Sequence, residues 1–264
     1  MRRVRIEPMV WLFAALGALI VLFVAAPLVW TVGSVSPSAL WQAVSEAEVR
    51  EAVSLTLWAS LVATLLALLT GVPLAYLLAR YDFPGKRLVE GIIDVPIVVP
   101  HSAAGIALLL IFGRKAIVGR LLAPLGLSFV AAVPGIVVAM LFVSLSFLVD
   151  AARDGFAAVD PRLERVARTL GASPWQAFWR VALPLAWRSI LSGMIMMWAR
   201  GLSEFGAVVI LAYHPMVAPV LIFERFEAYG LDYALPVAAL MILISLMVFV
   251  LLRMTTRRRA GRLG

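Results

Sequence analysis

Six long apolar stretches dominate this chain of 264 residues and limit what it can fold into. Each is long enough to cross a hydrocarbon layer, for which a helix needs roughly 20 residues. The period-2 alternation typical of transmembrane barrels is missing from the sequence, so helices must satisfy the backbone hydrogen bonds in lipid. We therefore predict an all-α integral membrane protein with six transmembrane helices, at Met9–Val32, Ala52–Ala79, Leu88–Phe112, Phe129–Val149, Leu185–Tyr213 and Tyr233–Leu252.

The composition agrees with a membrane protein and excludes several other classes. Hydrophobic residues make up 63% of the chain and charged residues only 14%, which would leave too much apolar surface on a soluble fold. The chain has no cysteine, which excludes disulfides, thiolate metal sites and cysteine nucleophiles. Its two histidines, His101 and His214, are too few and too far apart to suggest a metal centre. The net charge of +8 comes mostly from residues beside the apolar stretches. It indicates membrane orientation rather than binding to nucleic acid.

Basic residues are concentrated on one set of connections and at both ends of the chain. Acidic residues prevail in the first and fifth connections, at Glu46, Glu48, Glu51, Glu224, Glu227 and Asp232. By the positive-inside rule, we expect both termini and the fourth connection to lie in the cytoplasm. The basic residues that carry this expectation are Arg2, Arg3, Arg5, Arg80, Lys86, Arg87, Arg153, Arg162, Arg165, Arg168, Arg180, Arg188, Arg253, Arg257, Arg258, Arg259 and Arg262.

One connection disagrees with this orientation. Arg114, Lys115 and Arg120 fall on the side predicted to be outside. They can form a positive vestibule that attracts an anion, or they can reach from the ends of the spans to the membrane surface. On this basis the chain is a single membrane domain, 1–264, with an N-terminal span at 9–32 and a core of five spans within 52–252.

The fourth connection, at about 150–184, has the pattern of two short helices joined by a sharp turn. Asp160-Pro161 favours a helix start, since Asp caps free N–H groups and Pro suits the first helical position. Gly171 can adopt the left-handed conformation that ends this helix. The run Ser173-Pro174-Trp175-Gln176 resembles a capping box that opens a second helix. We expect a rigid cytoplasmic helix-turn-helix that is held at the membrane by Leu183-Pro184.

A rigid pair of helices between spans can transmit movement from a soluble partner. Glu164 is then expected to face that partner and to pair with a basic group on it, or it is an ordinary solvated helix residue. The alternative for the whole segment is an amphipathic hairpin that lies on lipid headgroups. The sequence has no phosphate-binding loop, because Gly85-Lys86 lacks the preceding glycine and leads to Arg rather than Ser or Thr. Any ATPase must therefore be a separate polypeptide.

Charged residues also occur in the middle of the fifth predicted span. Arg200 and Glu204 have the i, i+4 spacing that lets them neutralise each other on one helix face, and Ser203 lies between them. Charges at this depth persist mainly when they are paired or face water. The three residues can line a translocation path, with Arg200 attracting an oxyanion. Arg200 and Glu204 can equally form a structural ion pair at a dimer seam.

The third predicted span contains Pro96 and Pro100, followed by His101 and Ser102. Each proline removes a backbone donor, so we expect this helix to be kinked or locally unwound. Irregular backbone at membrane depth is tolerated where it lines a cavity. Pro100, His101 and Ser102 are therefore candidates for the path, where His101 and Ser102 would donate hydrogen bonds to an anion. A single histidine can instead pack against a neighbouring carbonyl group.

The fourth connection resembles the signature loop of ABC importer permeases. The residues that carry the match are Glu164, Val166, Ala167, Gly171, Ala172, Ser173, Pro174, Val181, Leu183 and Pro184, whereas Arg165 replaces the small residue usual in that position. Further stretches resemble the molybdate/tungstate branch of the family, which is related to the sulfate permeases. They are Phe83-Pro-Gly-Lys, Asp94-x-Pro-x-Val-x-Pro-His, Pro134-Gly-Ile-Val-Val-Ala-Met, Ala199-Arg-Gly-x-Ser-Glu-Phe-Gly-Ala and Tyr213-x-Pro-Met-x-Ala-Pro.

The resemblance implies a type I ABC importer permease of the cell membrane that works as a homodimer. Its partners would be two ABC ATPase subunits, which use ATP and Mg²⁺, and an extracytoplasmic oxyanion-binding protein; the permease itself would bind no cofactor. Sulfate or thiosulfate is the alternative substrate. An ion-coupled secondary transporter would usually show inverted repeats, which we do not see. A membrane hydrolase would need a nucleophile and base, for which only His101 and scattered Ser residues are present.

Overall fold

The structure is a computed structural model that describes residues 8–260, including the side chains of 9–250. Some residues used to orient the termini, Arg2, Arg3, Arg5 and Arg262, lie outside this range, as do the arginine side chains at 253 and 257–259. The described residues contain helices and no strands, which confirms the all-α prediction. The helices are α1 Pro8–Gly33, α2 Pro37–Ser45, α3 Ala47–Arg80, α4 Lys86–Val98, α5 His101–Phe112, α6 Ile117–Leu122, η1 Ala123–Leu125, α7 Val133–Ala157, α8 Pro161–Thr169, α9 Pro174–Ala177, η2 Phe178–Ala182, α10 Leu183–Leu202, α11 Gly206–Leu211, α12 Ala218–Tyr229 and α13 Leu231–Ala260.

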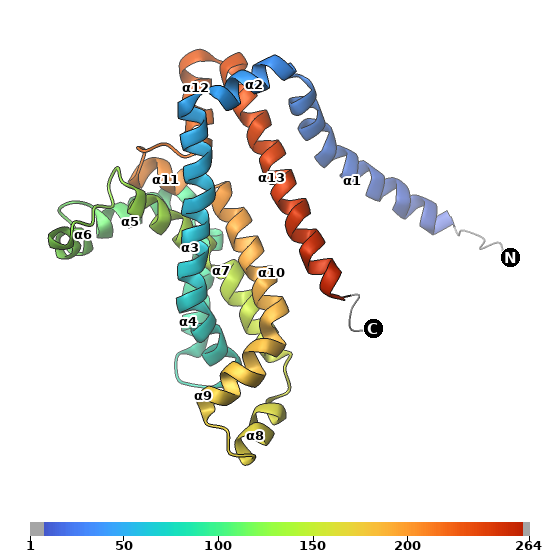
Figure 1. The fold of residues 1–264 in the computed structure, drawn as a ribbon, viewed down its shortest axis with the longest axis vertical. Coiled ribbons are helices and arrows are strands. Elements are labelled where there is room, and N and C mark those ends of the chain that lie inside the picture. Colours follow the sequence, from blue (N-terminus) through green and yellow to red (C-terminus); the bar gives the residue numbers. More distant parts are fainter. Residues whose placement is uncertain (1–7, 261–264) are drawn as a thin grey trace.

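Five helical segments are long and apolar enough to cross a membrane, and a sixth span is formed if the bent pair α4–α5 is counted as one. Helices α3, α7 and α10 pack side by side in the centre, with α4 beside α7 (Figure 1). Glycine allows the closest approach: a Cβ added at Gly193 of α10 would lie 2.7 Å from the Cβ of Ala151 on α7. Small residues at such contacts let the helix backbones approach closely. Van der Waals packing then stabilises the contact, since the hydrophobic effect does not drive helices together in lipid.

The third predicted span, Leu88–Phe112, is broken rather than merely kinked. Helix α4 ends at Val98 and α5 begins at His101. The helix direction bends by 118° between them. Val99 is extended, as expected for a residue that precedes proline, and Pro100 has no N–H to continue the helix. Pro96 is accommodated inside α4. The break redirects the chain into the lateral arm formed by α5 and α6 (Figure 1).

The fifth predicted span, Leu185–Tyr213, is too long. Helix α10 ends at Leu202, and α11 starts at Gly206 after a turn. Glu204 therefore lies beyond the helix rather than on a shared face with Arg200. A carboxylate oxygen of Glu204 accepts the N–H of Ala207 at 2.9 Å, so that the side chain caps α11 instead of continuing α10. The fourth span begins at Val133 rather than Phe129, with Pro134 in its first turn.

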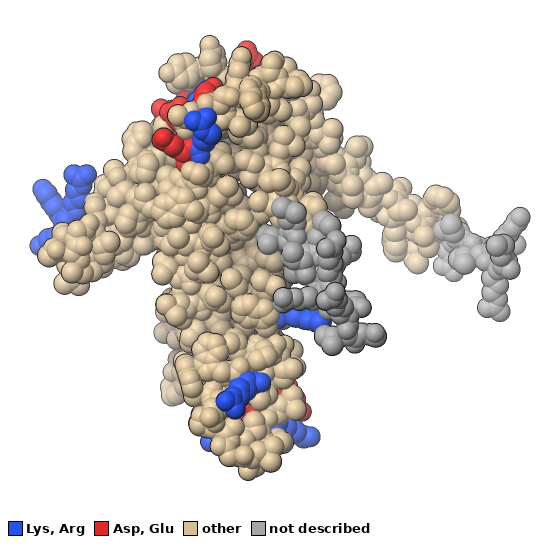
Figure 2. All heavy atoms as spheres, in the orientation of Figure 1, with Lys and Arg blue, Asp and Glu red and all other residues tan. Residues whose placement is uncertain are grey.

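The long helices connect two ends with different side chains. Helices α8 and α9 lie at one end, while α2 and α12, which we treated as parts of connections, lie at the other (Figure 1). On the face shown in Figure 2, basic side chains occur near α8 and on the α5–α6 arm, and acidic ones gather near α2 and α12. There Arg225 contacts Glu46 at 2.5 Å and Glu48 at 2.9 Å.

Tyr213 lies at the same end and donates a hydrogen bond to Glu224. This hydrogen bond is the main reason that the pKa of Tyr213 is raised.

Helix α1 extends away from the rest of the chain (Figure 1). Its side chains are largely exposed. Within the described residues, α13 is the one helix against which α1 packs closely. A helix that is apolar all around needs lipid or another protein surface about it. The division between the 9–32 span and a core of five spans stays a prediction.

Candidate functional site: the coupling loop and the central ion-pair cluster

The segment between α7 and α10 forms the helix, turn and helix that the sequence predicts. Asp160 caps α8 by accepting the N–H of Arg162 at 2.8 Å. Gly171 follows α8 with a φ of +94°. Residues with a Cβ atom are disfavoured in this left-handed conformation, whereas glycine adopts it readily. Ser173 and Gln176 form a reciprocal capping box at the start of α9, with distances of 2.9 and 3.2 Å. Local hydrogen bonds therefore hold the loop in a defined shape.

The boundaries of this loop differ from the predicted 150–184. Helix α7 continues to Ala157, so the loop proper begins after it. At the other end, α9 runs through the π-helical turn η2 into α10, and the helical run Pro174–Leu202 has no break at Leu183-Pro184. The π-turn accommodates Pro184, whose missing N–H would interrupt a regular helix. Helix α9 is therefore continuous with a membrane span.

Glu164 faces the interior of its own chain. Its side chain is 11% exposed and receives Arg80 Nε at 2.7 Å. The Tyr76 hydroxyl donates to its second oxygen at 2.6 Å. Arg80 also donates to the carbonyl oxygen of Val159 at 3.0 Å. Sequence reasoning missed Tyr76 altogether and used Arg80 only for orientation, because they lie 84 to 88 positions from Glu164.

On α8 and its C-cap residue, three apolar side chains are exposed beside Arg162, Arg165 and Arg168. Leu163, Val166 and Leu170 are 47%, 55% and 83% exposed. Their i, i+3, i+7 spacing places them on one side of the helix. Together these three side chains form what we call the α8 face. A free apolar surface of this kind at the end of a membrane protein is typical of a protein contact.

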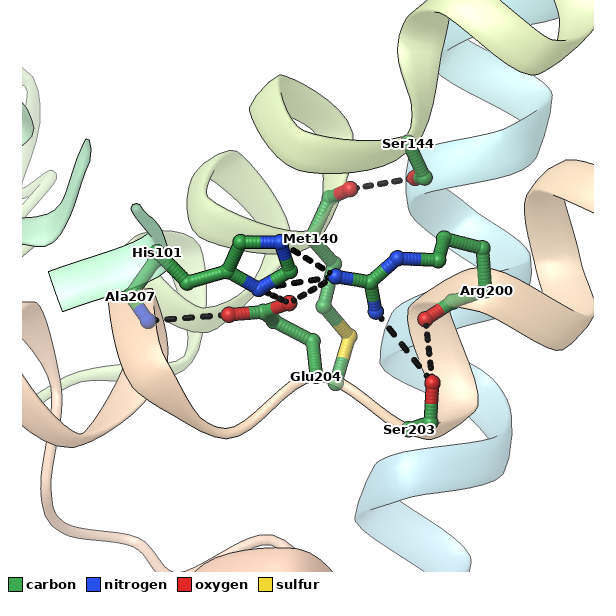
Figure 3. Close-up of polar contacts among 7 residues, drawn as sticks. All are labelled: His101, Met140, Ser144, Arg200, Ser203, Glu204 and Ala207. Carbon is green, nitrogen blue, oxygen red and sulfur yellow. Dashed lines mark hydrogen bonds and ion pairs between the residues drawn. The ribbon is translucent and has the colours of Figure 1, made fainter. Parts of the chain in front are cut away.

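A second group of predicted residues meets where the start of α5 lies against the turn between α10 and α11 (Figure 3). The Glu204 side chain is fully buried, with one oxygen 3.0 Å from Arg200 Nη2 and 2.8 Å from His101 Nδ1. Arg200 Nη2 also lies 2.7 Å from His101 Nε2, and Arg200 Nη1 donates to the Ser203 hydroxyl at 3.2 Å. We call Arg200, Glu204, His101 and Ser203 the central cluster.

Arg200 Nη2 lies 2.7 Å from both ring nitrogens of His101, and because Arg200 can only donate, one of these nitrogens must accept from it. With the proton on Nδ1, His101 donates to Glu204 and accepts from Arg200 at Nε2. The charges of Arg200 and Glu204 then balance each other. The cluster joins the broken ends of α5, α10 and α11, and a Cβ at Gly206 would come within 2.7 Å of the His101 Cβ. Its contacts thus hold these three ends in close approach.

The remaining predicted path residues lie beside the cluster. Pro100 occupies the break between α4 and α5. Ser102 is exposed in the first turn of α5. Arg200 and His101 keep 22% and 35% of their side-chain surface exposed, so the cluster is open on one side.

Comparisons with known proteins agree with this arrangement of spans and loop. Residues 71–261 match the family described as the binding-protein-dependent transport system inner membrane component. The chain belongs to this family. It is accordingly a membrane-spanning permease of an ABC importer, a transporter component rather than an enzyme.

Relatives with curated descriptions cover most of the chain. It is 46% identical to the molybdate/tungstate transport system permease protein WtpB of Thermococcus kodakarensis, over 94% of this chain and 96% of the relative. The WtpB protein of Methanocaldococcus jannaschii is 45% identical, over 91% and 94%. The sulfate transport system permease protein CysT of Synechococcus elongatus is 34% identical, over 79% and 77%.

Solved structures show the same fold. A bacterial ABC transporter involved in the import of the acidic polysaccharide alginate superposes with a TM-score of 0.73 at 18% identity. The alignment covers 94% of this chain and 96% of that one. The predicted type I ABC importer permease fold is therefore confirmed.

Proposed function

We propose that this chain carries molybdate or tungstate across the inner membrane in an ATP-driven importer. The observation that carries the proposal is the 46% and 45% identity, over more than nine tenths of the chain, to relatives described as molybdate/tungstate permeases. Sulfate is the second candidate, because sulfate permeases are 32% to 36% identical to this chain.

The proposed assembly has two copies of this chain, two ABC ATPase subunits and an extracytoplasmic oxyanion-binding protein. Both termini and α8–α9 lie in the cytoplasm, as the distribution of basic residues favours. The ATPase docks on the α8 face, whose exposed leucines and valine suit an apolar groove on the partner. ATP and Mg²⁺ are bound and used by the ATPase, and this chain binds neither.

Transport proceeds by alternating access. ATP draws the two ATPase subunits together and carries the α8–α9 loops with them, which tilts the spans and opens the path outward. Hydrolysis lets the loops part and opens the path inward. The continuous helix from α9 to α10 supports this coupling, because a rigid rod transmits displacement that a flexible loop would absorb.

The central cluster lines the path in this proposal. Arg200 is paired with Glu204, so its attraction for a passing oxyanion is reduced but not removed, since part of its side chain is open. His101 and Ser203 add polar groups at the same level, and Pro100 and Ser102 flank them. A paired cation suits transit, because an anion held too tightly would not leave.

The function is tested by uptake into proteoliposomes that contain the permease, its ATPase and the binding protein. We expect ATP-dependent uptake of molybdate and tungstate, with sulfate competing weakly. Uptake that prefers sulfate would replace the substrate assignment with the second candidate. Uptake by the permease alone, driven by a proton or sodium gradient, would contradict the ATP-driven mechanism.

A further inference from the structure

Glu164 occupies the position of the coupling loop at which we expected a carboxylate facing the partner. In the structure its two oxygens are already bound, one by Arg80 Nε at 2.7 Å and the other by the Tyr76 hydroxyl at 2.6 Å. The side chains of Arg80 and Glu164 are only 8% and 11% exposed. A carboxylate that is enclosed and paired in this way has little left to offer a second cation.

The residues that hold Glu164 all belong to the last turns of α3. Arg80 is the final residue of this helix, and Tyr76 lies one turn earlier. The Tyr76 ring is fixed in its turn by edge contacts with Phe156 of α7 and Phe178 of η2, at 5.2 and 4.9 Å between ring centres. Arg80 also donates to the Val159 carbonyl at 3.0 Å, just before α8. Helix α8 is therefore attached to α3 at two points.

We infer that Glu164, Arg80 and Tyr76 form a lock that ties the coupling loop to α3. Glu164 acts as a positioning residue within its own chain, and the ATPase contact is left to the α8 face. The loop then drives two spans: α10 through the continuous helix from α9, and α3 through the lock. This inference rests on the proposed docking of an ATPase at α8–α9.

A buried pair suits this role better than an exposed one. Breaking a buried ion pair leaves an uncompensated charge, which is costly, whereas exposed pairs contribute little. The chain offers a matched exposed pair nearby: Lys86 contacts Asp82 at 3.0 Å, and Asp82 is 98% exposed. Only the buried pair can carry displacement from one helix to another.

The test uses the complete complex in proteoliposomes and measures oxyanion uptake per ATP hydrolysed. Glu164→Gln and Arg80→Gln should each lower this ratio at least about tenfold, the size of a typical coupling energy between sites. The ATPase should still copurify with both variants, because the α8 face is unchanged. Tyr76→Phe should give a smaller loss in the same direction, and Lys86→Gln should leave the ratio unchanged.

The double variant Glu164→Gln/Arg80→Gln decides between the lock and two independent roles. If the residues act on each other, the double variant should be no worse than either single variant. Losses that multiply would overturn the lock, and so would release of the ATPase from Glu164→Gln, since Glu164 would then face the motor. Should a glutamine variant fail to fold in detergent, Tyr76→Phe provides the test, and an unchanged ratio for it would overturn the lock. A wild-type complex without ATP-driven uptake would instead refute the proposed function.

Discussion

Glu204 is fully buried, and its two oxygens are shared among three helix ends. One accepts the N–H of Ala207 at the start of α11, and the other contacts Arg200 from α10 and His101 from α5. A buried carboxylate needs these partners, because an unpaired charge away from water is strongly destabilising. At the scale of single residues, the junction of α5, α10 and α11 thus depends on a few charged contacts.

Replacing Arg200 should expose this dependence. Arg200→Gln leaves Glu204 buried without its cation, so we expect the free energy of unfolding to fall by about 3 kcal/mol. Uptake should fall as well, and Arg200→Lys should lie between this variant and the wild type. Lys86→Gln, which alters a pair whose carboxylate is 98% exposed, is the control. The measurements are denaturation in detergent and uptake in proteoliposomes. Unchanged stability together with unchanged uptake would remove both roles of Arg200.

Sequence spacing predicted some of these contacts and not others. Arg200 and Glu204 are four positions apart, so their pairing was predictable, although the reason given, a shared helix face, was wrong. His101 is 99 positions from Arg200, and Arg80 is 84 from Glu164. Contacts over such separations depend on how whole helices pack, which a single sequence does not reveal. The contacts of Glu164 with Arg80 and Tyr76 were not predicted for this reason.

Helix ends were predictable where their hydrogen bonds are local. The caps at Asp160 and Ser173 and the turn at Gly171 involve residues within three positions of one another, and the structure contains all of them. The end of α10 was not predicted, because apolar sequence continues beyond it and hides the turn. Hydropathy likewise treats α4 and α5 as one segment, since it measures composition and not direction.

The contact between α7 and α10 gives a prediction at the scale of elements. Gly193→Ala would place a Cβ 2.7 Å from the Ala151 Cβ and 3.1 Å from the Phe147 carbonyl oxygen. We expect overpacking to lower the free energy of unfolding by about 1–3 kcal/mol. Gly17→Ala in α1 is the matched control, because nothing lies within 4 Å of its added Cβ. If both variants unfold at the same temperature in detergent, the close packing of α7 on α10 is refuted.

At the scale of the whole molecule, composition and the apolar stretches were sufficient to predict an all-α integral membrane protein. The six apolar stretches correspond to five continuous spans and one broken pair, and the family match and solved structures agree with a permease fold. The substrate and the partners could not be derived from charge or spacing, because this chain presents only one side of each contact. Their assignment depends on relatives, and the orientation depends on where basic residues lie.

We propose that α8 meets an ATP-hydrolysing subunit on the cytoplasmic side. The chain has no cysteine, so Leu170→Cys introduces a unique thiol at a position that is 83% exposed. We expect this thiol to react with an impermeant maleimide only in inside-out vesicles, and a crosslinker attached to it to capture the ATPase. Tyr229→Cys, at the end that carries α12, should react only in intact cells. Labelling of Leu170→Cys from outside the cell, or no adduct with the ATPase in the assembled complex, would contradict the account.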